Sequence, residues 1–99
     1  MLNITKTTEG GAVTVLLEGR LDTTTAPQLE AELQDATDGI DELTLDLSAL
    51  EYVSSAGLRV LLSAQKRMSR RGGIKVAGAN RSVREIFGIT GFDNVLTLV

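Results

Sequence analysis

The 99-residue sequence contains no cysteine and no histidine. Without thiols it can form neither a disulfide nor a thiolate metal site, and without imidazole it lacks the usual base that activates a serine or cysteine nucleophile. These absences argue against a Ser-His hydrolase and against a zinc site. From composition we therefore expect a protein that is not an enzyme and that holds no metal and no cofactor.

Proline, aromatic residues and basic charge are also scarce. The chain has one proline, one tyrosine and two phenylalanines, and its ten basic and thirteen acidic residues give a net charge of −3. Nucleic-acid surfaces usually show a basic excess and stacking aromatics, so no nucleic acid is expected as a partner. No apolar run approaches the roughly 20 residues of a membrane span, and the N-terminus lacks a signal-peptide layout. We therefore expect a cytoplasmic protein with no membrane insertion.

What remains is the composition of an ordinary globular domain, with 42% hydrophobic and 23% charged residues. A chain of this length can build one hydrophobic core but not two. We expect residues 1–99 to form a single domain.

Short hydrophobic patterns alternate along the chain between the period of a strand and that of a helix. Glycines 10 and 11 indicate a hairpin, and strands separated by helices indicate parallel pairing. Leucines alternate with polar residues over 42–48, which predicts a sheet with one covered face. The predicted fold class is α/β, a mixed, mostly parallel five-stranded sheet with helices packed mainly on one face. Strands are expected at 2–6, 12–18, 42–48, 74–78 and 95–99, helices at 27–38, 58–71 and 82–87, and a loop at 49–57.

A serine pair, Ser54 and Ser55, stands where the expected loop enters a helix. In one interpretation both hydroxyls serve the helix cap. In the other, one serine caps the helix and the other is an exposed hydroxyl that can be phosphorylated, because a helix N-terminus tolerates a phosphate. Further along this helix Leu58, Leu61 and Leu62 are expected to face the sheet, with Arg59 and Ser63 on the outward flank.

Charged residues near the helix ends are the next candidates. Asp22, a loop carboxylate before Thr23, has the place of an ordinary helix-entry residue. The basic cluster at the end of the second helix either complements the helix dipole or contacts an acidic partner or phospholipid headgroups. That cluster consists of Lys66, Arg67, Arg70 and Arg71.

Three segments together resemble a known family. The segment 52–62, with the sequence YVSSAGLRVLL, resembles the phosphorylation-site segment of bacterial anti-sigma factor antagonists, the prototype STAS domains. The segment 18–22 resembles the family's glycine-x-leucine-aspartate stretch before the first helix. The segment 83–92 resembles its C-terminal helix and turn. The resemblance spans essentially the whole chain and implies the STAS fold, in agreement with the element pattern.

The resemblance also implies a function. In that family the unphosphorylated antagonist binds an anti-sigma factor serine kinase, which then releases its sigma factor. Phosphorylation of the antagonist's loop serine ends binding, and a serine phosphatase restores it. The alternative within the same fold is a STAS subunit of a phospholipid-transport ATPase complex.

Aligning on Gly57 and Leu58 places the family's phosphoacceptor at Ser55, with Ser54 as the second choice. Ser54 replaces an aspartate common in the best-known members, and Arg59 stands where glycine is common. The resemblance implies a partner-binding surface that consists of Asp22, Thr23, Ser54, Ser55, Gly57 and Arg59.

Overall fold

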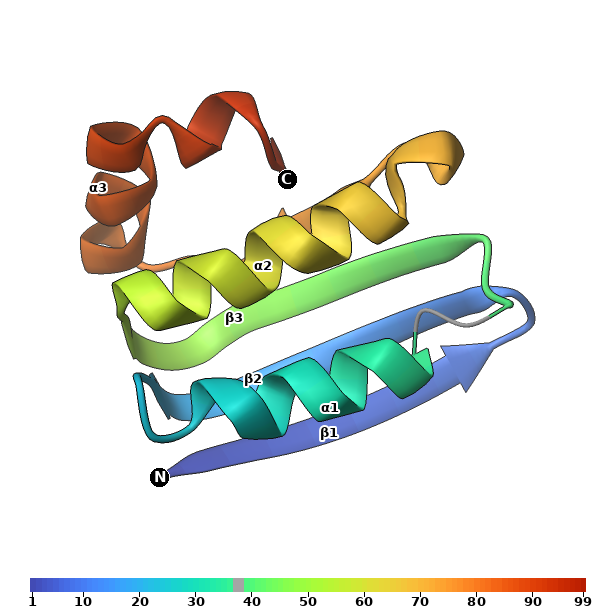
Figure 1. Ribbon diagram of the computed structural model, residues 1–99, viewed down its shortest axis with the longest axis horizontal. Coiled ribbons are helices and arrows are strands. Elements are labelled where there is room, and N and C mark those ends of the chain that lie inside the picture. The colour runs from blue at the N-terminus through green and yellow to red at the C-terminus, as the bar shows by residue number, and fades with distance from the viewer. Residues whose placement is uncertain (37–38) are drawn as a thin grey trace.

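The computed structural model describes residues 1–36 and 39–99. They form one five-stranded sheet in the order β1-β2-β3-β4-β5, in which β1 and β2 are antiparallel and the other neighbours are parallel (Figure 1). The elements are β1 (Leu2–Glu9), β2 (Ala12–Leu21), α1 (Ala26–Ala36), β3 (Glu42–Val53), α2 (Ser55–Arg67), a 3-10 turn (Ser69–Arg71), β4 (Ile74–Ala77), α3 (Arg81–Thr90), a second 3-10 turn (Phe92–Asn94) and β5 (Thr97–Leu98).

The helices share one face of this sheet. Figure 1 shows α1 and α2 side by side in front of the strands, with α3 beyond the start of α2. All three helices contribute to a single hydrophobic cluster with the inward residues of the strands. The opposite face carries side chains that are not buried, such as Thr14, Thr44 and Lys75. The predicted fold class, with its one covered face, is confirmed.

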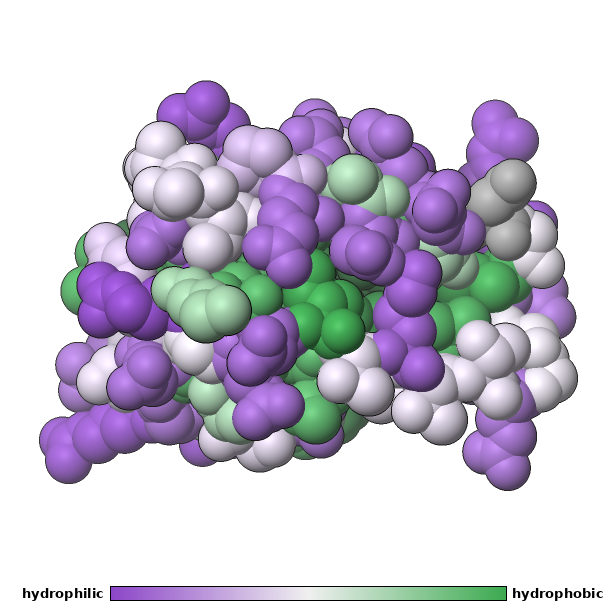
Figure 2. Space-filling view, turned by 90° about the horizontal axis from the view of Figure 1, so that it is seen from below, coloured by the Kyte–Doolittle hydropathy of each residue, from purple (hydrophilic) through white to green (hydrophobic). Residues whose placement is uncertain are grey.

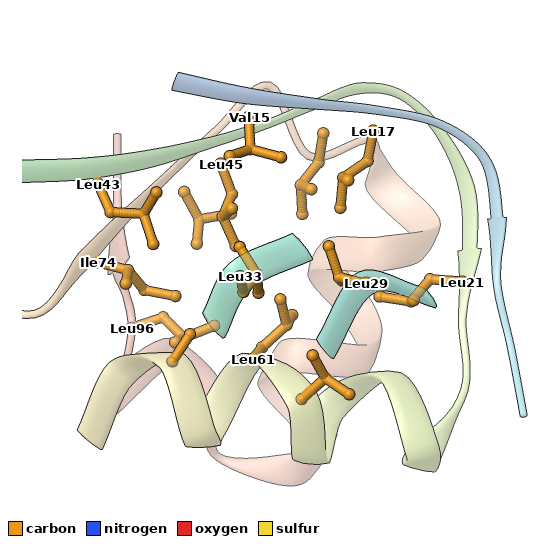
Figure 3. Packing of buried hydrophobic residues seen from close by; sticks show 14 of the residues in the cluster. Val15, Leu17, Leu21, Leu29, Leu33, Leu43, Leu45, Leu61, Ile74 and Leu96 are labelled. Carbon is orange, nitrogen blue, oxygen red and sulfur yellow. The ribbon is translucent and has the colours of Figure 1, made fainter. Parts of the chain in front are cut away.

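Leucine dominates the core between sheet and helices. Val15, Leu43 and Leu45 point from the strands toward Leu33 of α1 and Leu61 of α2 (Figure 3). All five side chains are fully buried. Seen from the β1 edge, hydrophobic atoms gather mainly in a central band, with polar side chains above and below it (Figure 2). Strand alternation and helix periodicity therefore direct their apolar sides into one layer.

The predicted loop at 49–57 is wrong, because β3 continues to Val53 and α2 begins at Ser55. The register between β2 and β3 shifts twice, between Leu16 and Glu18 and between Gly19 and Arg20. Such irregularities add unpaired residues to one strand and break its alternation. The hydrophobic alternation stops after residue 48, which predicted a loop, although the chain stays in the sheet as far as Val53. The last strand is shorter than predicted and covers only Thr97–Leu98.

Candidate functional site

The ends of β2 and β3 bring the predicted site residues together. Leu21 and Val53 pair as the last residues of these parallel strands. The backbone N–H of Ser54 then donates to the carbonyl oxygen of Leu21 at 2.8 Å. This bond ties the loop that enters α2 to the loop that enters α1. Loops at the carboxyl ends of parallel strands are a common place for binding sites in α/β sheets.

The two serines have different places in the structure. Ser54 is the N-cap of α2, since its side-chain oxygen accepts a hydrogen bond from the backbone N–H of Gly57 at 3.2 Å. Its carbonyl oxygen accepts the first helical bond, from Leu58 N–H at 2.9 Å. Ser55 is the first residue of the helix and is exposed. Among residues 1–36 and 39–99, no hydrogen bond occupies its hydroxyl. The interpretation in which one serine caps and the other is exposed fits this geometry.

Gly57 lies in the first turn of α2 and is buried against the end of β2. A Cβ at this position would stand 2.6 Å from Cγ of Leu21 and 3.3 Å from the carbonyl oxygen of Leu21. Glycine therefore allows α2 to begin directly on the sheet. Because Gly57 is itself buried, it lies beneath the exposed residues predicted for the partner surface and positions the start of α2.

Asp22 organises the other loop. Its Oδ1 accepts hydrogen bonds from the backbone N–H groups of Thr24 and Thr25, each at 3.0 Å. The buried Thr25 hydroxyl donates to the carbonyl oxygen of Arg20 at 2.9 Å and accepts from the N–H of Asp22 at 2.9 Å. The backbone bond from Thr25 is the main cause that holds the pKa of the Asp22 carboxyl below its ordinary value of 3.8. These bonds fit the helix-entry role, and they leave Thr23 exposed at the tip of the loop.

Arg59 lies on the exposed side of α2, where it lines a groove between α1 and α2. The groove has a volume of about 490 Å³ and begins beside the two loops, at Thr23 and Ala56. Leu62 also lines this groove and is only half-buried, so the prediction that it faces the sheet is wrong. Val60 and Ala64 are buried with Leu58 and Leu61 instead. Val60 lines the groove as well, and the remaining groove residues are Ala26, Pro27, Glu30, Ser63 and Lys66.

One neighbouring pair was not identified from the sequence. The Arg20 guanidinium lies over the Tyr52 ring, 4.7 Å from its centroid, in cation–π contact. The two residues are partners across β2 and β3. They directly precede Leu21 and Val53, which point inward, so Arg20 and Tyr52 lie on the open face of the sheet at the same end. Only the shifted strand register makes them neighbours, and no motif in the sequence signals it.

The chemically notable group of the site is the exposed hydroxyl of Ser55. No histidine or cysteine exists to activate Ser55 as a nucleophile. In the part of the chain that the structure describes, no group of three or more acidic side chains is placed to hold a metal ion. Across that same part, none of the helices combines the length and apolar character needed to cross a bilayer.

Comparisons with known proteins agree with this architecture. A family model described as "Mlab, STAS domain" matches residues 4–99. BtrV of Bordetella bronchiseptica, provisionally named an anti-sigma factor antagonist, is 40% identical over 84 residues, which cover 83% of this chain and 72% of BtrV.

Solved structures show the same fold. The crystal structure of an anti-sigma factor antagonist from Mycobacterium paratuberculosis matches with a TM-score of 0.91 and 27% identity, over 99% of this chain and 85% of that one. The phosphorylated form of SpoIIAA, a Bacillus cell fate determinant, matches with a TM-score of 0.74 and 16% identity, over 100% and 91% of the two chains, which is a likeness of fold. The chain therefore belongs to the STAS domain family, among the bacterial anti-sigma factor antagonists.

Proposed function

We propose that the protein is a phosphorylation-controlled partner switch. The unphosphorylated form binds an anti-sigma factor serine kinase in the cytoplasm, and the kinase releases its sigma factor. The kinase then transfers the γ-phosphoryl group of ATP to Oγ of Ser55, the hydroxyl proton leaves and ADP is released. A serine phosphatase hydrolyses the phosphoester and returns Ser55 to its binding form. The protein itself acts by binding and carries out no chemistry.

The observation that carries this proposal is the separation of roles between the two serines. Ser54 is committed to the cap of α2 through its hydroxyl and its carbonyl oxygen. Ser55 is exposed on the first turn of the helix. A phosphate on Ser55 would thus leave the cap in place. It would meet the positive end of the helix dipole, which favours a negative group.

The position of Ser55 also explains how one modification can end binding. Thr23 and Arg59 are exposed near it, around the two loops joined by the bond between Ser54 and Leu21. A phosphate adds a charge of about −1.5 to −2 to this surface. A partner that fits this surface with an unmodified Ser55 would have to bury that charge or be displaced by the bulk of the phosphate. Removing a group of this charge from water is costly even beside one cation, so the partner dissociates.

The family supports the same reading. BtrV, the relative that is 40% identical, is provisionally named an anti-sigma factor antagonist. SpoIIAA, which shares this fold, has been solved in a phosphorylated form. An antagonist of an anti-sigma factor needs that factor as its partner, and the exposed Ser55 loop is the surface on which phosphorylation can control the contact.

A kinase assay on two single variants tests this proposal. Serine kinases encoded near this gene or near sigma factor genes are purified and incubated with the protein and ATP, and the modified residue is mapped by mass spectrometry. Phosphate on Ser55, lost in Ser55→Ala and retained in Ser54→Ala, is the expected result. Phosphate confined to Ser54 would overturn the choice of acceptor.

Binding is measured separately by calorimetric titration with the same kinase. The unmodified protein should bind, and the Ser55 phosphoprotein should bind at least tenfold more weakly. No binding by either form, together with stable association with subunits of a phospholipid-transport ATPase, would replace the proposal by the alternative role.

A further inference from the structure

Ser55 and Arg59 are four residues apart on α2, and both side chains are exposed. Side chains at this spacing are neighbours on one helix face, with Cβ atoms about 5–6 Å apart. The Cα–Cβ bonds of a helix tilt toward its N-terminus, so a long side chain at 59 extends toward position 55. An acidic group four residues before a basic one is also the more favourable order.

The Arg59 guanidinium is available for such a contact. Among residues 1–36 and 39–99, no hydrogen bond or ion pair engages it. It borders the groove between α1 and α2, where the other charged lining residues are Glu30 and Lys66. Lys66 stands seven positions beyond Arg59 on the same helix, two turns farther from Ser55. Arg59 is therefore the nearest cation to Ser55 along α2.

We propose that Arg59 is a phosphate clamp: its guanidinium pairs with a phosphate on Ser55 and holds it against α2. This inference rests on the proposed function, because it requires Ser55 to carry the phosphate. A guanidinium presents two parallel N–H donors that match two phosphate oxygens. The pair would cancel one of the roughly two negative charges and fix the direction of the group. Phosphorylation would then make Arg59, an exposed arginine of the proposed partner surface, one half of an ion pair.

The clamp predicts a measurable change in phosphate ionisation. A neighbouring cation favours the dianion over the monoanion and so lowers the second pKa of the phosphoserine. Phosphoserine is installed at position 55 by genetic incorporation, which needs no kinase, and its second pKa is followed by phosphorus NMR at low salt. Arg59→Gln should raise that pKa by about 0.3 unit, as for a surface pair worth a few tenths of a kcal/mol.

Two further variants separate the clamp from general charge effects. Arg67→Gln removes the same charge from the exposed side of the same helix, about 18 Å along the axis from position 55, and should leave the pKa of the phosphoserine unchanged. Arg59→Lys keeps the charge but lacks the planar pair of guanidinium N–H donors. Its phosphoserine should have a second pKa between those of the parent and Arg59→Gln proteins. The helix N-terminus is common to all these proteins, so its influence cancels. Equal pKa values in the parent and Arg59→Gln proteins, with the helix content of both intact, would overturn the proposal.

The pKa measurement tests the clamp independently of the kinase assay. If no kinase modifies Ser55 but Arg59→Gln still raises the pKa of the incorporated phosphoserine, the proposed function fails and the clamp geometry stands. If a kinase modifies Ser55 but the pKa is the same in the parent and Arg59→Gln proteins, the switch stands and the clamp is wrong.

Discussion

Gly57 rests directly on Leu21, so that a Cβ at position 57 would stand 2.6 Å from Cγ of Leu21. Leu21 is the last residue of β2 and is fully buried. Its carbonyl oxygen also accepts the N–H of Ser54 at 2.8 Å. The end of β2 thus positions the cap and first turn of α2 from two sides. The exposure of Ser55 depends on this contact between helix and strand.

Replacing Gly57 by alanine should therefore destabilise the protein. The added methyl cannot be accommodated without moving α2 or Leu21, and overpacking of this kind costs about 1–3 kcal/mol. Gly88→Ala is the control, because Gly88 is also helical but has only Oδ2 of Asp93 nearby, at 3.9 Å. That change should be neutral or stabilise the fold by up to about 1 kcal/mol. Urea unfolding of both variants measures the difference. Equal free energies of unfolding would show that the start of α2 can move to accommodate the methyl group without cost.

The two serines should separate stability from phosphorylation. Ser54→Ala removes the oxygen that accepts from Gly57 N–H and should cost about 1 kcal/mol, within a range of about 0.5–2. Ser55→Ala changes an exposed side chain and should alter the free energy of unfolding by less than about 0.5 kcal/mol. Denaturant unfolding measures both. A larger loss in Ser55→Ala than in Ser54→Ala would reverse the assigned roles.

Regular periodicity allowed most of the elements to be predicted from the sequence. The alternation around Leu43, Leu45 and Leu47 located β3 and its buried side, and all three side chains are fully buried. The continuation of β3 to Val53 could not be predicted in this way, because the shifted register against β2 interrupts the alternation. The pairing of Arg20 with Tyr52 was missed for the same reason.

The candidate site could be predicted only in part from the sequence. The limit here is that a sequence does not fix the backbone position of each residue at a helix start. A serine before a helix is a cap signal, but two adjacent serines offer two caps, and only backbone position distinguishes them. The structure makes Ser54 the cap and Ser55 the first helical residue. Helix spacing alone also does not decide whether Val60 or Leu62 is buried beside Leu61, because that depends on how α1 packs against α2. Both Leu62 and Val60 line the groove, but Leu62 is only half-buried whereas Val60 is buried.

The Asp22 loop should make stability depend on pH in the acid range. Hydrogen bonds from Thr25 and Thr24 hold the pKa of the Asp22 carboxyl below 3.8 in the folded protein. A lowered folded pKa stabilises the fold above the unfolded pKa, and this contribution is lost as pH falls through the folded value. Asp22→Asn keeps an oxygen acceptor but has no charge to lose. The variant should be less stable at neutral pH and converge with the parent protein in acid.

Thermal unfolding from pH 7 down to about pH 2 measures this convergence, over the range in which carboxylates of lowered pKa are protonated. Asp93→Asn serves as the control, since it removes one exposed carboxylate far along the chain from this loop. A difference between the parent and Asp22→Asn proteins that stays constant across the whole range would contradict a charge-dependent role for Asp22.

The rotation of α2 buries Leu61 in the core and leaves Leu62 half-buried in the groove. Leu61 is fully buried among the core residues, and its truncation to alanine should cost about 2–5 kcal/mol. Leu62 is half-buried in the groove beside Arg59, so Leu62→Ala should cost less, on the order of 1 kcal/mol. Unfolding measurements on the two variants use the same chemical change on adjacent residues. If Leu62→Ala proved as costly as Leu61→Ala, Leu62 would be as buried as Leu61 in solution. The rotation of α2 described above, and with it the position of Arg59 beside the groove, would then be wrong. If the difference holds, Leu62 becomes an apolar contact available to the partner, and its truncation should weaken kinase binding more than it weakens the fold.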